Sequence, residues 1–362
     1  MNVHVIVFLF ILLASGMGNC FAETTAEQAV LRVAGWDVYA DPEHRNKTIG
    51  YESFEQQFGY KIEFTPLTHL DEIIHYAESH QDIDVLIISN EGIEILHKMN
   101  LVKNLDLEKI PFYQELHPSL RYSKWSQFDG QIYAVPWAWG PTGLLYDSNS
   151  MPMPDSWNIF WDAKYKGKVS LWNDVSMIWT TALALGYKNV YNLTQEQLDE
   201  VKKKLLQLNG QVYSYYDGEQ QEMKLLASGN VLLANSWFNP SSRLAKHNRQ
   251  FKMVIPKEGA VGMFDSYMIS NHCRLNEIAH SFINHQISPQ VQKQMSHITG
   301  LAPSNIETLA LLSQAEIKAL HLDDQNYFRK MLLWDVMPRK HLYDKIMVEI
   351  QEDMKNRKTM DE

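Results

Sequence analysis

Short apolar segments rich in β-branched residues alternate along this chain with longer amphipathic stretches. Thr194 and Gln197, at the start of one such stretch, have the spacing of a capping box. Ser288 lies just before Pro289, as an N-cap residue does before a proline in the first helical turn. Alternation of strands and helices predicts an α/β fold with largely parallel sheets and helices on both faces. The expected strands are 31–34, 61–67, 84–89, 131–139, 167–172, 210–215, 231–237, 251–256 and 266–270.

The first 22 residues contain no Lys, Arg, Asp or Glu, and their centre, residues 3–14, is almost wholly apolar. This segment is too short to span a membrane comfortably, and Ala22 is a small residue suited to cleavage before Glu23. We therefore expect residues 1–22 to be a cleaved signal peptide and the mature protein to reach the periplasm. Lipoprotein cleavage before Cys20 and an uncleaved anchor are the alternatives.

Removal of these 22 residues from the 362 leaves 340, which is enough for two lobes with separate cores. Cys273 is then the only cysteine, so no internal disulfide can form and the cores alone must stabilise the exported protein. No later apolar run approaches the roughly 18 residues of a membrane-spanning helix. We expect the mature protein to be soluble.

All of the formal net charge of -10 belongs to the mature protein. This acidic balance disfavours nucleic acid as a partner and favours a cationic ligand or a basic partner surface. An acidic surface that serves solubility alone is the alternative. The chain also has 10 Trp and 17 Tyr, several of them where a strand meets a loop, which indicates that some rings line a site.

The segment GWDVYA, residues 35–40, follows the short apolar strand expected at 31–34. Ligands of open α/β sheets lie beyond the carboxyl ends of the strands, so Trp36, Asp37 and Tyr39 are expected to face one. Aromatic faces beside a carboxylate suit an organic cation. Asp37 has a second interpretation as the N-cap of a helix.

The run at residues 133–147 is too interrupted by Pro136, Gly140 and Pro141 to be one regular strand, yet it is too apolar to be an exposed loop. We expect the chain to pass here from one lobe into the other. Its two tryptophans, Trp137 and Trp139, then lie near a hinge or in the core of the first lobe.

Motifs of catalysis and of cofactor or metal binding are missing from the sequence. The histidines are scattered without an HxxxH pair, and no cysteine cluster accompanies them. There is no GxSxG elbow, no GxxxxGK[ST] loop and no GxGxxG after a strand. The sequence therefore predicts no enzyme, no cofactor and no metal site, and a secreted hydrolase is the least favoured interpretation.

Several motifs resemble, in sequence order, those of the periplasmic spermidine/putrescine-binding proteins, over nearly the whole mature chain. They are GWDVYA, DVLIIS, YAVPWAWGPTGL, SWNIFWDAKYKGKVSLWND, SGNVLLANSW, VIPKEGAVGMFDSYMIS and TGLAPSN. The resemblance implies a two-lobed periplasmic binding protein of type II, in which each lobe is a mainly parallel sheet flanked by helices and a hinged cleft lies between. We expect lobe 1 to comprise 23–138 and 265–309, and lobe 2 to comprise 139–264 and 310–362.

The family's ligand-contacting residues can be carried over to matching positions. Its aromatic residues on the first lobe match Trp36 and Tyr39, and its tryptophan on the second lobe matches Trp237. Its two aspartates match Asp174 and Asp265. Such a set suits a polyamine, because carboxylates meet the ammonium groups while flat rings cover the methylene carbons. Asp174 has a second interpretation as a helix N-cap.

The chain departs from the family pattern at the site, mainly by exchanging acids and rings. Met177 stands where the family has a second acid, and Met263 stands where it has a tryptophan. Leu301 stands where the family has a tyrosine, and Asp335 where it has a glutamine. Conversely, Glu91, which follows Ser89, stands where the family has a tyrosine. This redistribution implies a similar triamine with different nitrogen spacing or end groups, and a weaker match to putrescine. Glu91 has a second interpretation as a solvated acid in a first helical turn, and Asp335 as the ion-pair partner of Arg339.

The resemblance implies lobe closure around the ligand, with a membrane partner that reads the closed form. We expect a monomer whose partner is an inner-membrane receptor that controls cyclic-di-GMP and biofilm, as in the norspermidine-sensing branch. The alternatives are an ABC permease for polyamine uptake and a docking module without a small ligand. The predicted ligand-binding residues are Trp36, Asp37, Tyr39, Ser89, Glu91, Asp174, Trp237, Asp265 and Asp335.

Overall fold

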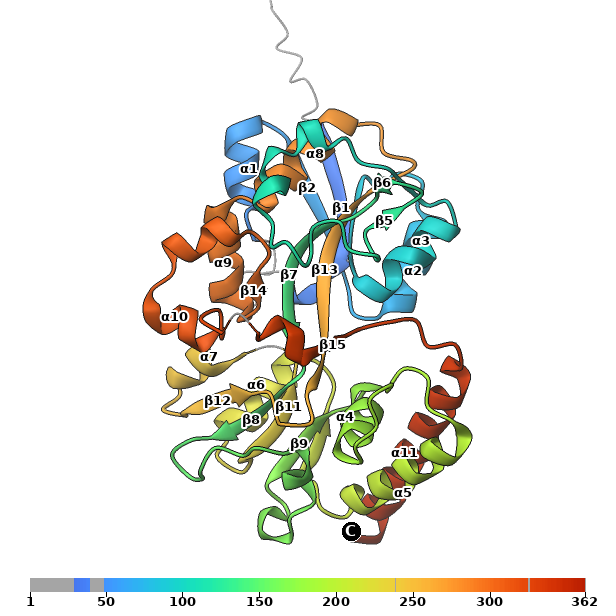
Figure 1. The fold of residues 1–362 in the computed structure, drawn as a ribbon, viewed down its shortest axis with the longest axis vertical. Coiled ribbons are helices and arrows are strands. Elements are labelled where there is room, and N and C mark those ends of the chain that lie inside the picture. The colour runs from blue at the N-terminus through green and yellow to red at the C-terminus, as the bar shows by residue number, and fades with distance from the viewer. Residues whose placement is uncertain (1–28, 40–48, 238, 325, 362) are drawn as a thin grey trace, which may run out of the picture.

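The computed structural model describes residues 29–39, 49–237, 239–324 and 326–361. These residues form two α/β lobes, one above the other in Figure 1, each built on its own sheet. The two-lobed α/β class predicted from the sequence is confirmed. The predicted signal peptide lies outside the described residues.

The sheet of the first lobe is mixed. Its strands are β1 (Val30–Trp36), β2 (Lys61–Leu67), β3 (Val85–Ser89), β4 (Val102–Lys103), β7 (Val135–Pro141), β13 (Ala260–Ser270), β14 (Ala302–Pro303) and β15 (Met331–Leu333), in the central order β14-β7-β13-β3-β1-β2. β1 is parallel to β2 and to β3, as strand-helix alternation predicts. β13 is antiparallel to β3, β4 and β7, because the chain returns to this lobe from the opposite direction.

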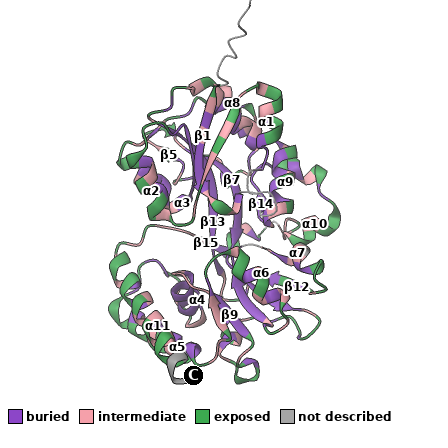
Figure 2. Cartoon of the chain, turned by 180° about the vertical axis from the view of Figure 1, so that it is seen from behind, coloured by how far each residue is buried: buried purple, intermediate pink, exposed green. Residues whose placement is uncertain are grey.

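Helices cover both faces of this sheet (Figure 1). They are α1 (Tyr51–Phe58), α8 (Asn276–Gln286) and α9 (Pro289–Thr299) on one side and α2 (Leu70–Ser79) and α3 (Asn90–Lys98) on the other. Alternate residues of β3 enter different cores: Val85 and Ile87 pack with the first group, and Leu86 and Ile88 with the second. β3 is therefore buried along its whole length, as the continuous apolar run of a central strand predicts. The neighbouring strand β13 is likewise buried at every residue (Figure 2).

The sheet of the second lobe is also mixed. Its strands, in sheet order, are β10 (Ser214–Tyr216), β9 (Val169–Trp172), β11 (Leu233–Ser236), β8 (Gly143–Asp147) and β12 (Phe251–Val254). Its helices are α4 (Ser176–Ala184), α5 (Gln195–Asn209), α6 (Glu219–Ala227), α7 (Ser241–Ala245) and α11 (Lys340–Asp361). The parallel strands β9, β10 and β11 end at the edge that faces the first lobe.

The remaining elements are short. They are α10 (Gln314–Ala319), the hairpin β5 (Gln127–Phe128) with β6 (Gln131–Ile132), and 3₁₀ turns at Asp37–Tyr39, Leu107–Lys109, Pro111–Glu115, Trp157–Trp161, Ala163–Tyr165, Ile306–Leu311 and Phe328–Lys330. No helix among the described residues is both long enough and apolar enough to cross a membrane.

The crossing predicted for residues 133–147 is confirmed. β7 belongs to the first sheet and β8 to the second, and only Thr142 separates them. Trp137 lies in the core of the first lobe, where its indole N–H donates to the carbonyl of Gln286 at 3.1 Å. The chain crosses back into the first lobe between β12 and β13. The lobe boundaries expected from the sequence remain a prediction.

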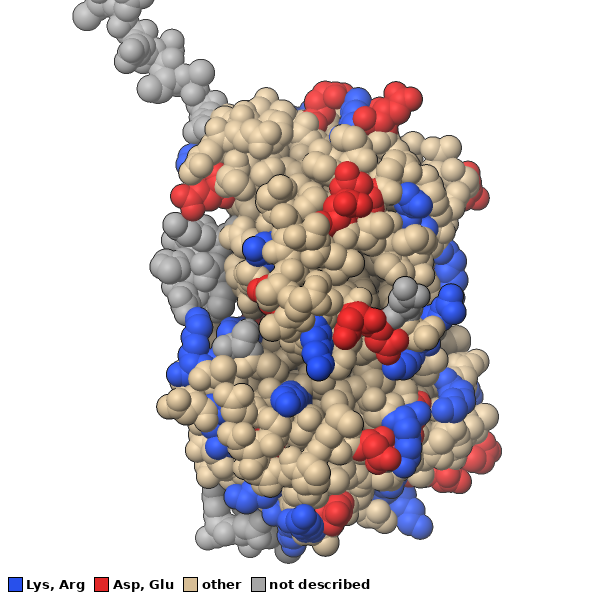
Figure 3. Space-filling view, turned by 60° about the vertical axis from the view of Figure 1, so that its left-hand side comes forward, with Lys and Arg blue, Asp and Glu red and all other residues tan. Residues whose placement is uncertain are grey.

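The helix starts follow the predicted signals. Thr194 and Gln197 form a capping box at α5. Ser288 is the N-cap residue of α9 with Pro289 in the first turn, but its hydroxyl donates to the carbonyl of His285 at 2.6 Å instead of accepting from the helix. On the face drawn in Figure 3, basic and acidic side chains are interspersed, so the acidic balance forms no single-sign surface there.

Candidate ligand-binding site

The first half of the site lies at the end of β1. Trp36 is the last residue of this strand, Tyr39 follows in a 3₁₀ turn, and Asp265 lies opposite them in β13. The Tyr39 hydroxyl donates to the Asp265 carboxylate, which is only 3% exposed. Residues more than 200 positions apart therefore meet at this strand end, as the sequence predicts.

Ser89 and Glu91 complete this half. Ser89 ends β3 directly opposite Asp265 in the sheet register, and its hydroxyl donates to Glu91 Oε1 at 2.7 Å. Glu91 Oε2 is buried and has no hydrogen-bond partner among the described residues. The carboxylate is therefore not the solvated acid of a first helical turn. We call Asp265 and Glu91 the carboxylate pair.

Burial controls the protonation of the carboxylate pair. It raises the pKa of Asp265 to about 7, against the opposing effects of hydrogen bonding by Tyr39 and of the nearby Trp36 indole. It raises the pKa of Glu91 to about 8, where the Ser89 hydroxyl opposes the shift and the charge of Asp265 adds to it. Two buried acids without a cation thus retain protons near neutral pH.

The second half of the site lies at the strand ends of the other lobe. Asp174 follows β9 and accepts the Ser176 N–H at 2.8 Å and the Ser176 hydroxyl. The N-cap residue of α4 is Val175, so Asp174 contacts the first residue of this helix without being its N-cap. Asp174 Oδ2 also accepts the Trp237 indole N–H at 2.8 Å. Burial raises the pKa of Asp174, and the bonds from Ser176 and Trp237 oppose the shift.

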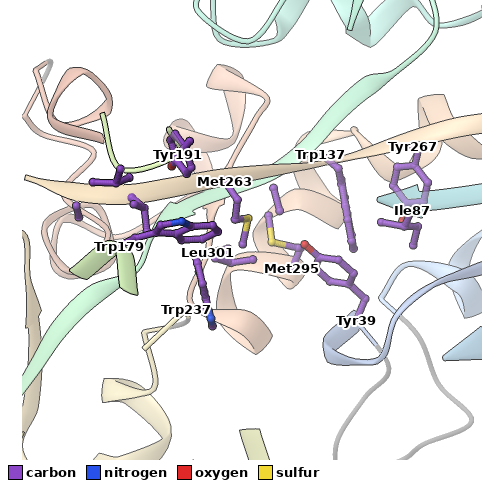
Figure 4. Packing of buried hydrophobic residues seen from close by; sticks show 14 of the residues in the cluster. Tyr39, Ile87, Trp137, Trp179, Tyr191, Trp237, Met263, Tyr267, Met295 and Leu301 are labelled. Carbon is purple, nitrogen blue, oxygen red and sulfur yellow. The ribbon is translucent and has the colours of Figure 1, made fainter. Parts of the chain in front are cut away.

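Aromatic and apolar side chains lie along the site between the two halves (Figure 4). Figure 4 shows Tyr39, Trp137 and Tyr267 at one end, Trp179, Tyr191 and Trp237 at the other, and Met263 and Leu301 between them. Met177, Met263 and Leu301, the apolar replacements in the family pattern, are at most 5% exposed. Met263 and Leu301 lie between the rings of the two halves (Figure 4), whereas Met177 faces a cavity in the second lobe lined by Phe160 and Leu171.

Sequence reasoning missed three aromatic residues that complete this end of the site. The Trp334 ring lies 4.7 Å from that of Trp237 and 5.3 Å from that of Trp179, and the Trp179 ring lies 5.2 Å from that of Tyr191. Trp179 belongs to an apolar helix and Tyr191 to a loop, where no pattern distinguishes them from core residues. Trp334 precedes Asp335 in a segment without a strand or helix pattern.

Two predicted site residues are more exposed than the others. Asp37 is exposed in the turn before Tyr39. Asp335 binds Lys124, with 2.8 Å between Oδ2 and Nζ, so the suggested pairing with Arg339 is wrong. Arg339 instead donates to the Asn192 side chain at 3.0 Å. The Lys124 pair is half exposed and contributes about 0 to 1 kcal/mol of stability.

Within residues 29–39, 49–237, 239–324 and 326–361, no three His, Cys, Asp or Glu side chains are placed to hold a metal ion. The buried acids are instead paired with hydroxyl, indole and aromatic groups, an environment that suits an organic cation.

Two α/β lobes, each with its own mixed sheet and joined by crossing strands, have the fold of a type II periplasmic binding protein. The sequence model of the bacterial extracellular solute-binding proteins matches residues 51–320, and the chain belongs to this family.

Known relatives support the resemblance to the polyamine-binding members of the family. The spermidine/putrescine-binding periplasmic protein of Salmonella typhimurium is 24% identical over 92% of this chain and 93% of its own length. Spermidine/putrescine-binding periplasmic protein 1 of Haemophilus influenzae is 26% identical over 69% of this chain and 72% of its own. The resemblance predicted from the sequence is confirmed.

Solved structures share the fold. A putative spermidine/putrescine ABC transporter protein from Listeria monocytogenes superposes with a TM-score of 0.77 at 21% identity, covering 90% of this chain and 99% of that one. The spermidine/putrescine ABC transporter substrate-binding protein PotD from Streptococcus pneumoniae gives 0.74 at 19% identity, with 90% and 100% covered.

Proposed function

We propose that this protein is a periplasmic polyamine-binding protein that closes around a triamine similar to spermidine or norspermidine. The proposal is supported above all by the convergence of Asp265, Glu91 and Tyr39 on one lobe and of Asp174 and Trp237 on the other. The names of the relatives point to the same class of ligand.

The separation of acids between the lobes suits a ligand with charges at intervals. An ammonium group at the carboxylate pair and another at Asp174 each gain a buried counter-ion, while the rings between them cover methylene carbons and add about 0.5 to 2 kcal/mol for each cation-π contact. Burial of an ammonium without such a partner costs several kcal/mol. The site therefore favours polyamines over neutral solutes of the same shape.

Lobe closure follows from the same division. A ligand that contacts both halves binds the closed form better than the open one, and this difference in affinity shifts the population towards closure. The flanking crossings at Thr142 and between β12 and β13 are the segments about which the lobes would move. No chemical step is involved.

We propose that the closed monomer is read by an inner-membrane receptor that controls cyclic-di-GMP and biofilm formation. The redistributed acids, with Glu91 in place of a tyrosine and Met177 in place of an acid, support a ligand other than that of the uptake proteins. The second candidate is the substrate-binding subunit of an ABC polyamine transporter, which is favoured by the names of the relatives. A neighbouring gene for a permease and an ATPase would favour uptake, and one for a membrane-bound cyclic-di-GMP enzyme would favour sensing.

Calorimetric titration with putrescine, spermidine and norspermidine tests the ligand class. We expect both triamines to bind more tightly than putrescine, and Asp265→Ala to weaken triamine binding about 100-fold, since removing one partner of a buried charge pair costs about 2 to 5 kcal/mol. Asp155→Ala is the matched control, because Asp155 is an exposed acid paired with Lys257. Equal weak heats for all three ligands, unchanged in Asp265→Ala, would exclude the proposal.

A further inference from the structure

Four aromatic side chains at the second-lobe end of the site form a continuous group, which we call the aromatic cluster: Trp179, Tyr191, Trp237 and Trp334. Successive ring centroids lie 5.2, 5.3 and 4.7 Å apart at steep interplanar angles of 72°, 72° and 58°. Two of these contacts are edge-to-face and the third is tilted, and such packing restricts the orientation of each ring and the direction of each indole N–H.

The aromatic cluster has four polar groups, three indole N–H groups and one phenol hydroxyl. Two of them have a hydrogen-bond partner among the described residues and two do not. The Trp237 N–H donates to Asp174, and the Tyr191 hydroxyl donates to the carbonyl of Leu332 at 2.7 Å. The indole N–H groups of Trp179 and Trp334 are buried and find no acceptor in the described part of the chain. Trp179 itself is only 3% exposed. A buried donor without an acceptor is costly, so these two groups call for an acceptor from elsewhere.

The acids near the aromatic cluster do not meet this need. Both oxygens of Asp174 already accept hydrogen bonds, from Ser176 and from Trp237, and the second acid of the family pattern is Met177 here. Glu91 is close enough for its charge, together with that of Asp335, to raise the pKa of Tyr191 beyond the effect of burial. Glu91 Oε2 itself has no donor. The site thus holds unpartnered donors and an unpartnered acceptor.

A plain polyamine cannot satisfy this combination, because ammonium groups only donate hydrogen bonds. An amide oxygen can accept from an indole N–H, which no ammonium group can do, while the free ammonium groups of the same ligand donate to the carboxylates. Resting on the proposed function, we propose that the preferred ligand is a polyamine with one acylated nitrogen, whose amide lies in the aromatic cluster while its free ammonium groups occupy the carboxylate pair and Asp174.

Calorimetry of the purified protein with spermidine and its two mono-N-acetyl forms tests this inference. We expect one acetylated form to bind at least as tightly as spermidine. Trp334→Phe and Trp179→Phe keep an aromatic ring but remove the donor, and each should weaken binding of that form about tenfold more than binding of spermidine. Trp161→Phe is the control, because the Trp161 N–H already donates to the carbonyl of Lys204 at 2.9 Å, away from the aromatic cluster.

The ratio of the two affinities in each variant separates the lost hydrogen bond from any general loosening of the site. Spermidine binding ten times more tightly than both acetylated forms would overturn the inference and leave the proposed function standing. Equal losses for acetylated and parent ligand in both tryptophan variants would overturn it as well. Failure of all three compounds to bind would overturn the proposed function and the inference together.

Discussion

At the scale of single residues, the carboxylate pair links binding to pH. Asp265 and Glu91 have pKa values raised to about 7 and about 8, whereas an ammonium ligand favours their ionised forms. Binding should therefore release protons, and spermidine affinity should rise between pH 6 and 8.5, by up to about tenfold per pH unit for each proton released. Titration in buffers of different ionisation enthalpy measures this release. An affinity that is flat over this range would contradict the assignment, and Glu91→Gln should reduce the slope.

Asp174 and Trp237, both on the second lobe, should contribute differently to the binding free energy of a triamine. Asp174→Ala removes the buried acid that accepts the Trp237 N–H and should weaken triamine binding by about 3 kcal/mol. Trp237→Phe keeps an aromatic face but loses the bond to Asp174, and should cost about 1 kcal/mol. Calorimetry of both variants gives the order, and thermal unfolding checks that each still folds. A larger loss for Trp237→Phe would show that Asp174 does not meet an ammonium group of the ligand.

At the scale of elements, two helix ends offer a matched pair of glycines. Gly59 and Gly300 end α1 and α9 with φ of 73° and 70°. A β-carbon on Gly59 would meet nothing within 4 Å, but one on Gly300 would lie 2.3 Å from the carbonyl oxygen of Asn239, two residues after Trp237. The end of α9 therefore packs against the chain segment that carries a ring of the site.

Alanine at these two positions should have different effects. Gly59→Ala should cost about 1 to 2 kcal/mol of stability, which is the cost of the left-handed conformation alone. Gly300→Ala should cost more, because the Asn239 segment must move, and it should also weaken ligand binding severalfold through Trp237. Denaturant unfolding and calorimetry compare the two variants. Equal costs with unchanged affinity would show that the Asn239 segment adapts freely.

At the scale of the whole molecule, buried acids oppose folding as pH rises. The pKa values of Asp265, Glu91 and Glu222 are raised by burial to about 7, 8 and 8, above the values near 4 of an unfolded chain. The native protein thus holds more protons than the unfolded one above pH 4, and its stability falls as pH rises through 7 and 8. Without ligand, the melting temperature should be lower at pH 8.5 than at pH 7.

A polyamine should reverse this trend, since it binds the ionised native form and stabilises it by mass action. Melting curves at pH 7 and 8.5, with and without spermidine, test the direction of the pH effect in each case. Asp265→Asn should reduce the fall in melting temperature between the two pH values when no ligand is present. An unliganded protein that gains stability over this range would show that these acids are ionised in the native state.

Part of the candidate site was predictable because Trp36 and Ser89 end strands β1 and β3. β2 has the predicted bounds, and β3 and β9 begin one and two residues later than expected. Asp265 lies in the middle of β13, because this strand begins at Ala260 and not at residue 266, and the sheet register places it opposite Ser89. The crossing at Thr142 was readable from prolines and glycine in an apolar run. The mixed character of the sheets was harder to predict, because the direction of a strand depends on the side from which the chain re-enters the lobe.

The sequence by itself determined the alternation of elements, the family and the strand-end residues, because these follow from local periodicity and from ordered motifs. Tertiary structure alone decided that Asp335 binds Lys124, that Glu91 is buried beside Asp265, and that Trp179, Tyr191 and Trp334 join Trp237. The physical reason is that burial and partner choice are properties of side chains brought together from distant segments, and no local pattern records which segments will meet.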